Sequence, residues 1–300
     1  MAAVQPLAEL RTLIARHAVE GARELMTGLT VKAVFKPTAS MPSVDEPVFA
    51  VVAQGAKRTV LADRVFEYRA GHYLVVSVDL PVSSRVTQAS EKAPFLGLGL
   101  KLNPELIASV LLETGTGDAG VDGRLGLEVS EAPVELLEAV VRLLRLLDRP
   151  ADIAVLRPLI EREIVWRLLS GDQAAMVRQV GLADSRLSRV RRAIRWIRDH
   201  YAEPIAIERL AERAAMSARS FRRHFRTATA MSPLQYQKQI RLQEARTRLM
   251  SNGHDVANVG FAVGYDSPSQ FSREYARLFG APPGRDAERW RAAVSPVFEE

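Results

Sequence analysis

The chain has 300 residues, of which 47% are hydrophobic and 25% are charged, and its formal net charge is +6. This composition predicts a folded protein with room for two domains and excludes an intrinsically disordered chain. The absence of cysteine excludes disulfides and thiolate metal sites. No apolar run reaches the roughly 18 residues of a membrane span, and the first residues lack a signal-peptide pattern, so we expect a cytoplasmic protein without a membrane partner.

The first long segment, from Lys32 to Leu102, has the alternating pattern of β-strands. Its runs, separated by glycine, proline and aspartate, are EPVFAVVAQG, KRTVLADRVFEYRAG, HYLVVSVDLPVSSRV and APFLGLGLKL. Short alternating runs of this kind predict an antiparallel barrel or a double-stranded jelly roll. A helix is predicted to follow, with Asn103 as its cap and Pro104 at its first position.

The strand segment is compatible with an enzyme or with a ligand-binding domain. Barrel oxygenases hold a metal with several histidines and a carboxylate, but His72 is the only histidine in this segment. The strand segment has no Walker, GxSxG or GxGxxG motif either, so we expect no catalytic residue, no metal and no cofactor.

A barrel of this type commonly leaves room for one small ligand. Its candidate lining residues are Phe66, Tyr68, His72 and Leu74. Filling of the core is the alternative role for each of them. Because no charged cluster is evident in the segment, we expect an apolar or weakly polar effector.

Two helices are predicted after the strands, in APVELLEAVVRLLRLLD and ADIAVLRPLIEREIVWRLLSG. Apolar residues of the first cover roughly 220° of the helix, more than the 100° or so that faces one core. We therefore expect a second apolar seam to pair two chains in a homodimer, with burial on both sides within one chain as the alternative. This seam consists of Leu136, Val140, Leu143 and Leu147.

The next segment, SGDQAAMVRQVGLADSR, is predicted to be a hinge, with a domain boundary near residue 182. The charge changes at the same place. Residues 183–300 hold 21 Lys and Arg against 13 Asp and Glu, whereas residues 1–182 hold 20 against 22. Twenty of those 21 basic residues are arginine, whose planar guanidinium suits phosphate and guanine. This asymmetry predicts a polyanionic partner for the C-terminal part.

The C-terminal part contains an internal repeat with an offset of about 50 residues. IERLAERAAMSARSFRRHFRTATAMSP aligns with VANVGFAVGYDSPSQFSREYARLFGAPP. Each copy has the pattern of a short helix, a tight break and a second helix that begins after a capping serine, Ser217 or Ser267. Gly264 supplies a permissive turn residue in the second copy, where the first copy has Ala215. This order predicts two helix-turn-helix motifs.

The predicted helix-turn-helix units span about residues 205–228 and 255–278, and a helix from about 233 to 250 joins them. The segments RLQEARTRLM and VGFAVGYDSPSQFSREYARLFGAPPGR carry a specific resemblance. Residues from about 186 to 289 resemble the DNA-binding domain of the AraC/XylS family of bacterial transcription regulators. Gly260 departs from the family pattern, which usually has alanine there.

The strand segment resembles the cupin-like sensory domain that precedes the DNA-binding domain in this family. The resemblance implies an α+β protein of two domains. Residues 1–182 would form a cupin-like β-barrel with appended helices, for effector sensing and dimerisation. Residues 183–300 would form an all-α DNA-binding domain with the two helix-turn-helix units.

The arginine-rich stretch MSARSFRRHFRTATA indicates how such a helix would meet double-stranded DNA. Wound as a helix, it has four arginines on one face and Phe221 and Phe225 on the opposite face. The second helix of a helix-turn-helix lies in the major groove, so the polar face is expected to contact DNA. The expected contacts are Arg219, Arg222, Arg223 and, at phosphate, Arg226 in the first unit, and Ser269, Gln270, Ser272 and Arg273 in the second.

Three functions are compatible with these patterns. The favoured hypothesis is a sequence-specific transcription regulator that responds to a small-molecule effector, with RNA polymerase as a further partner if it activates. The alternatives are a cupin-type metalloenzyme carried on a DNA-binding module and a nucleoid-type protein that binds by charge alone. The joining helix spans about 27 Å, so the two units are expected to reach successive major grooves about 34 Å apart. Arg241 and Arg246 on this helix are expected to be structural or to contact phosphate.

Overall fold

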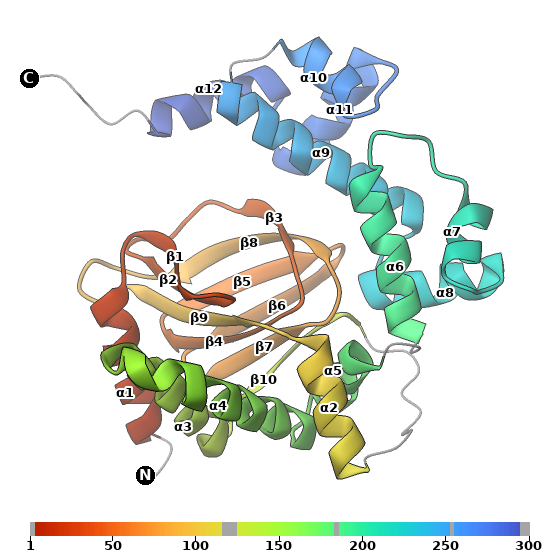
Figure 1. Cartoon of the computed structure of the whole chain (residues 1–300). Helices are drawn as coiled ribbons and strands as arrows, with labels where there is room; N and C mark the ends of the chain where they lie inside the picture. The colour runs from red at the N-terminus through yellow and green to blue at the C-terminus, as the bar shows by residue number, and fades with distance from the viewer. Residues whose placement is uncertain (1–3, 116–124, 183–185, 253–254, 295–300) are drawn as a thin grey trace, which may run out of the picture. The chain divides into compact units, whose positions relative to one another are not determined.

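The computed structural model of the chain describes residues 4–115, 125–182, 186–252 and 255–294. The chain divides into two compact units, one of residues 1–191 with 223–230 and one of residues 192–222 with 231–300. The first contains antiparallel sheets with helices and the second is helical in its described part, which confirms the predicted α+β class (Figure 1). The domain boundary near residue 182 stays a prediction.

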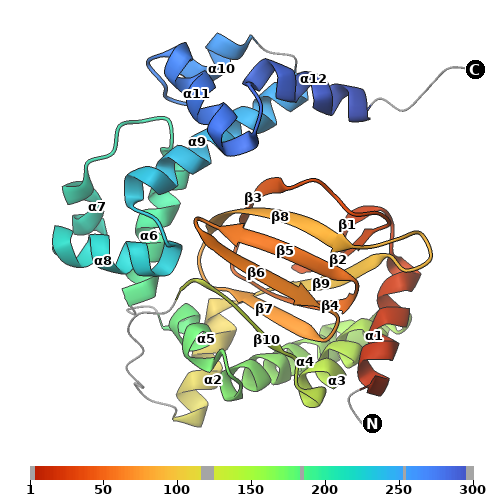
Figure 2. The ribbon, with the colours of Figure 1, turned by 180° about the vertical axis from the view of Figure 1, so that it is seen from behind.

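The first unit contains two separate antiparallel sheets and not a closed barrel, so of the two expected architectures the jelly roll describes it. The six-stranded sheet has the order β1-β2-β9-β4-β7-β10, and the four-stranded sheet has the order β3-β8-β5-β6. The chain crosses repeatedly between the two sheets, which lie face to face as in a jelly roll (Figure 2). The strands are β1 (Gly21–Met26), β2 (Leu29–Val34), β3 (Met41–Asp45), β4 (Val48–Gln54), β5 (Ala56–Leu61), β6 (Arg64–Arg69), β7 (His72–Val76), β8 (Leu80–Gln88), β9 (Phe95–Lys101) and β10 (Leu127–Glu131).

Two edge strands lie outside the segment that the sequence pattern predicted as strands. β1 reads GARELM and is mostly exposed or half-buried, so its apolar residues do not alternate. β10 pairs with β7 at the other edge of the six-stranded sheet. An edge strand has a neighbouring strand on one side only, so fewer of its side chains are buried. Its sequence therefore shows a weaker alternation of apolar and polar residues.

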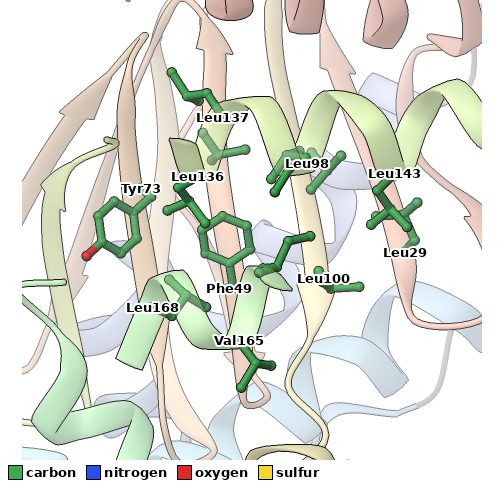
Figure 3. Packing of buried hydrophobic residues seen from close by; sticks show 14 of the residues in the cluster. Leu29, Phe49, Tyr73, Leu98, Leu100, Leu136, Leu137, Leu143, Val165 and Leu168 are labelled. Carbon is green, nitrogen blue, oxygen red and sulfur yellow. The ribbon is translucent and has the colours of Figure 1, made fainter. Parts of the chain in front are cut away.

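Helices cover one face of the six-stranded sheet, where α1, α3 and α4 lie together (Figures 1 and 2). The strand residues that meet them alternate, as Leu29, Val31 and Ala33 do in β2. Figure 3 shows this core, with Leu29 among side chains from the sheet and from α3 and α4. The helices of this unit are α1 (Val4–His17), α2 (Pro104–Thr114), α3 (Val134–Arg145), α4 (Pro150–Ser170) and α5 (Ala174–Gly181).

The predicted start of the helix after the strands is confirmed, and the second of the two following helices includes Pro150, which was predicted to lie in the break before it. The side-chain oxygen of Asn103 accepts hydrogen bonds from the backbone N–H groups of Glu105 (2.9 Å) and Leu106 (3.2 Å), which caps α2. Pro150 begins α4, where its fixed φ suits the first turn.

The segment predicted to be a hinge contains the helix α5. Its Met176, Val177 and Val180 are buried in the core of the first unit. Their spacing places them on one side of a helix, so packing against the core stabilises a helix where a linker was expected. Residues 183–185 of the predicted hinge lie outside the described residues.

The wide apolar arc of α3 is buried within one chain. Leu136, Val140 and Leu143 are at most 2% exposed, and Leu147 packs partly buried against the same core. α3 lies against both α1 and α4, so each of its two seams has a neighbour in the same chain. Burial on both sides, the alternative named above, describes these residues, and the argument for pairing two chains through this seam no longer holds.

The remaining helices follow residue 185, and in the second unit they pack around α9. Leu242 and Leu249 of α9 form a buried cluster with Val259, Phe271 and Tyr275. None of the described helices combines the length and apolar character that a membrane span requires. The helices are α6 (Arg186–Asp199), α7 (Ile207–Arg213), α8 (Ala218–Thr229), α9 (Pro233–Asn252), α10 (Val256–Ala262), α11 (Pro268–Phe279) and α12 (Pro283–Val294).

The burial of Leu143 predicts that Leu143→Glu prevents stable folding of the first unit. An unpaired carboxylate in an apolar core costs several kcal/mol, comparable to the whole stability of a domain. Circular dichroism with urea unfolding measures the loss, and Glu138→Gln on the exposed face of α3 is the control. A folded, monomeric Leu143→Glu variant would return this seam to a dimer interface.

Candidate nucleic-acid interface

The two helix-turn-helix motifs have the same turn geometry. Ala215 in the first and Gly264 in the second both have positive φ, 49° and 91°. In both turns the next backbone N–H donates five residues back, from Met216 to Ala211 (2.9 Å) and from Tyr265 to Gly260 (3.0 Å). The repeat seen in the sequence is therefore a repeat of backbone structure.

Only the second turn requires glycine. A Cβ at Gly264 would lie 2.2 Å from the carbonyl oxygen of Ala202, in addition to the strain of its positive φ. Ala215 has a similar φ, at a cost of about 1–2 kcal/mol for a residue with a side chain. Gly260 also has a structural reason, because a Cβ there would meet the ring of Phe271 at 3.0 Å.

Each recognition helix, α8 and α11, has a serine cap and two buried aromatic anchors. The hydroxyl oxygen of Ser217 accepts from Ser220 N–H, and that of Ser267 accepts from Gln270 N–H, both at 3.3 Å. The predicted capping serines are thus confirmed. The aromatic anchors are fully buried at the corresponding positions, which are Phe221 and Phe225 in α8 and Phe271 and Tyr275 in α11.

The residues expected to contact DNA occupy the opposite faces of these helices. All of them are exposed except Ser272, which is half-buried; they are Arg219, Arg222, Arg223 and Arg226 on α8 and Ser269, Gln270, Ser272 and Arg273 on α11. Arg222 lies 3.6 Å from Glu208, but both side chains are exposed. Because such an ion pair contributes about 0–1 kcal/mol, Arg222 is available to another anion.

Glu274 is an acidic residue beside the polar face of α11 that sequence reasoning missed. Its carboxylate accepts hydrogen bonds from Lys238 (2.9 Å), Tyr265 (2.8 Å) and Gln270 (3.3 Å). Burial opposes the charged form, but these donors outweigh it and lower the pKa of Glu274. Glu274 therefore stays ionised and holds the amide of Gln270, four residues earlier on the helix.

Arg241 of α9 holds the segment before α7 next to the turn of the second motif. Its guanidinium donates to the carbonyl oxygens of Tyr201 (2.6 Å), Ala202 (3.1 Å), Glu203 (3.1 Å) and Gly264 (2.6 Å). A planar group with five donors suits this cluster of carbonyl oxygens. Arg241 thus has a structural role, which is one of the two roles expected from the sequence; the other was a contact with phosphate.

Arg246 of α9 also points into the protein. It forms a bidentate pair with Asp286 of α12, at 2.8 and 3.2 Å, and Asp286 accepts a further bond from the hydroxyl of Tyr275 (2.8 Å). This network attaches the second recognition helix to α9 and α12.

The predicted effector-lining residues lie on both sheets of the first unit. Phe66 and Tyr68 belong to β6, and Leu74 of β7 alternates with Tyr73 and Val75, which face the helices. Leu74 therefore faces the four-stranded sheet. His72 stands apart at the start of β7, where its Nδ1 lies 3.2 Å from the carbonyl oxygen of Arg69. No cluster of three or more metal-ligating side chains occurs among the residues that the structure describes.

Family comparison agrees with this geometry. A model of the AraC-type transcriptional regulator N-terminus matches residues 25–176, and a helix-turn-helix domain model matches residues 210–289. The chain therefore belongs to the AraC-type transcriptional regulators, a class of DNA-binding proteins. The metalloenzyme hypothesis finds no support in these matches.

Curated relatives include the HTH-type transcriptional activator RhaS from two bacteria. The protein from Escherichia fergusonii is 33% identical over 125 residues, which cover 40% of this chain and 41% of the relative. The protein from Salmonella agona is 27% identical over 162 residues, which cover 53% of this chain and 56% of the relative. The chain thus spans about half the length, or less, of the curated relatives it matches.

Two solved structures of ToxT from Vibrio cholerae share the whole fold. Unsaturated fatty acid bound wild-type ToxT from strain SCE256 has a TM-score of 0.56 at 11% identity and covers 93% of this chain and 100% of that one. ToxT from strain O395 bound to (E)-4-(8-methylnaphthalen-1-yl)but-3-enoic acid has a TM-score of 0.54 at 8% identity and covers 88% and 99%. At this identity the similarity concerns the fold alone.

The role of Arg241 predicts that Arg241→Met lowers the free energy of unfolding by about 2–3 kcal/mol, because four hydrogen bonds from a charged donor to partly buried or exposed carbonyl oxygens are lost together. Arg248→Met on the same helix is the matched control. Arg248 forms an i, i+4 pair with Glu244 at 2.8 Å and donates to the hydroxyl of Tyr201 at 2.6 Å. Both partners are side chains that water can solvate when Arg248 is absent, so we expect its loss to cost about 1 kcal/mol. Urea unfolding followed by circular dichroism measures both, and equal losses would contradict the assigned role of Arg241.

Proposed function

We propose that the protein is an effector-controlled, sequence-specific transcription regulator that reads two successive major grooves with one chain. The observation that carries the proposal is the repeat of backbone structure in the two helix-turn-helix motifs, each with an exposed polar face. The joining helix α9 has 20 residues, which corresponds to about 30 Å. This length suits motifs that enter grooves about 34 Å apart.

The two recognition helices have different chemistry. In α8, Arg219, Arg222 and Arg223 are assigned to base edges, where arginine most often pairs with guanine, and Arg226 to phosphate. In α11, the base contacts are assigned to Arg273 and to the shorter polar side chains of Ser269, Gln270 and Ser272. The first half of the binding site should therefore be rich in guanine and the second half less so.

Effector control is proposed for the first unit. The facing residues Phe66, Tyr68 and Leu74 are candidates for contacts with a small molecule between the two sheets. Support comes from the ToxT structures, which share the fold and were solved with an unsaturated fatty acid and with a substituted butenoic acid. The RhaS relatives are transcriptional activators, so RNA polymerase is a proposed partner of this chain as well.

A homodimer is proposed through α4 in place of α3. This helix exposes four large apolar side chains, Val155 (67%), Leu156 (39%), Leu159 (60%) and Trp166 (41%). A soluble monomer seldom exposes so many on one element. In an antiparallel pair of α4 helices with a two-fold axis between residues 160 and 161, Val155 of one copy lies opposite Trp166 of the other, a small side chain against a large one.

The function is tested by genome-wide footprinting with the purified chain, followed by binding measurements on a recovered site. Arg222→Ala and Arg223→Ala should each lose about 1–3 kcal/mol of specific affinity and relax base preference in one half of the site. Arg226→Ala is the control, and it should weaken specific and random DNA alike and reduce the salt dependence. An equal loss on random DNA for all three variants would contradict base reading by Arg222 and Arg223.

The dimer is tested by Leu159→Glu, which places a charge at the centre of the proposed interface. We expect a folded monomer in sedimentation velocity, since Leu159 is exposed within the chain. Binding to paired sites should weaken because avidity is lost, while binding to a single site should stay unchanged. Wild type that sediments as a monomer at micromolar concentration would refute the interface.

A further inference from the structure

Two helices of the second unit begin with the same short pattern, a serine, a proline, any residue and a glutamine. SPLQ begins α9 and SPSQ begins α11. In both, the serine hydroxyl accepts from the backbone N–H of the glutamine, at 3.2 Å for Gln235 and 3.3 Å for Gln270. A glutamine at this position commonly bonds back to the N–H of the capping residue, which forms a capping box. The two glutamines thus have equivalent backbone positions, and only their side chains differ.

The glutamine of α9 closes its capping box, and that of α11 does not. The side-chain oxygen of Gln235 accepts from the backbone N–H of Ser232 at 2.9 Å. Gln270 instead donates from Nε2 to the carboxylate of Glu274 at 3.3 Å. Among the described residues, its side-chain oxygen has no donor and the N–H of Ser267 has no acceptor. Gln270 is also exposed, so its oxygen remains available to an outside donor.

The residue four positions after each glutamine accounts for this difference. Glu274 lies one helical turn after Gln270, on the same side of α11. Gln239, a neutral residue, occupies the same place after Gln235 in α9. A hydrogen bond to a charged group is about twice as strong as one between neutral groups. Glu274 therefore competes successfully with the N–H of Ser267 for the amide of Gln270.

Glu274 is itself held in place and kept charged. Its Oε1 accepts from Nζ of Lys238 (2.9 Å), and its Oε2 accepts from the hydroxyl of Tyr265 (2.8 Å). Burial favours the neutral form, but the donors outweigh it and lower the pKa of Glu274. An ionised carboxylate has no proton to donate, so it binds the NH2 of Gln270 and not the oxygen. Lys238 also neutralises its charge, which limits repulsion of a phosphate nearby.

A fixed amide has a direct consequence for base reading. Glutamine reads adenine with both ends of its amide, because the oxygen accepts from N6 and the nitrogen donates to N7. The nitrogen carries two hydrogens, so one can bond to Glu274 while the other bonds to the base. Without the carboxylate, the amide is able to turn over or to close the capping box on Ser267. In both cases its oxygen is lost to the base.

We propose that Glu274 is a specificity-determining positioning residue, which holds Gln270 so that the second recognition helix selects adenine at one position of the binding site. The inference rests on the proposed function, which assigns Gln270 to a base contact. It adds the residue that orients Gln270 and the base that is selected. The first recognition helix has Ser220 and His224 at the corresponding places and so lacks a carboxylate there.

The test measures base preference at every position of a recovered site, with duplexes that replace one base pair at a time. Wild type should prefer adenine at one position of the second half, and Gln270→Ala should lose that preference. Glu274→Gln gives α11 the residue type that α9 has at this place. It should reduce the same preference by about two- to tenfold, because the amide must then be ordered on binding. Combined with Gln270→Ala, it should have no further effect at that position.

Glu288→Ala is the matched control for the loss of a negative charge. Glu288 is exposed on α12, and its removal should change the affinity for all duplexes alike and leave every base preference as in wild type. Circular dichroism checks that each variant is folded.

Hydrogen exchange of the full chain, followed by NMR, gives a second readout that needs no DNA. In wild type, the N–H of Ser232 should be protected by its capping box and that of Ser267 should exchange faster. Glu274→Gln should slow the exchange at Ser267, because Gln270 then closes the box. Since wild type alone already tests the difference between the two serines, the proposal stays open to refutation if the variant does not fold.

The positioning role is overturned if Gln270→Ala affects a position that does not prefer adenine, or if Glu274→Gln leaves that preference unchanged. A change at a different position from that of Gln270→Ala would overturn it as well, because Glu274 would then contact a base itself. Equal protection of Ser232 and Ser267 in wild type would contradict the open capping box. Failure of the regulator function appears separately, since wild type would then bind selected and random DNA equally and both proposals would be refuted.

Discussion

Burial of two aromatic rings on each recognition helix determines which side chains remain to contact DNA. Phe221 and Phe225 are fully buried, and so are Phe271 and Tyr275 at the corresponding positions of the second motif. A helix with one face held in this way cannot rotate, so its polar side chains project in a fixed direction. The anchors thus convert a sequence pattern into a surface with defined chemistry.

The arginines of the C-terminal part serve two different purposes. Those on α8 lie on the exposed face, where their repulsion is tolerated because solvent screens it and a polyanion would reverse it. Arg241 and Arg246 instead bond to backbone carbonyls and to Asp286 within the protein. Composition counts both groups equally, although only the first adds to the field that DNA meets.

The six-stranded sheet also uses its two faces differently. One face is apolar and packs against α1, α3 and α4. The other face meets the four-stranded sheet, whose inner face carries the linked hydroxyls of Thr59, Tyr68 and Ser84.

The sequence by itself determined the features that arise from neighbouring residues. The helix caps at Asn103, Ser217 and Ser267 and the repeated turn at Ala215 and Gly264 depend on local hydrogen bonds and backbone angles, which the residue types specify directly. The family resemblance rests on the same local patterns.

Only the tertiary structure decided how the apolar faces and isolated charges are used. The apolar arc of α3 is buried because α1 and α4 both cover it. Leu159 of α4 is as apolar as the leucines of α3, but it stays exposed because no described element covers it. Likewise, Glu274 meets Lys238 of another helix. These contacts join residues far apart along the chain, and an amphipathic pattern states that a face will be buried without stating what buries it.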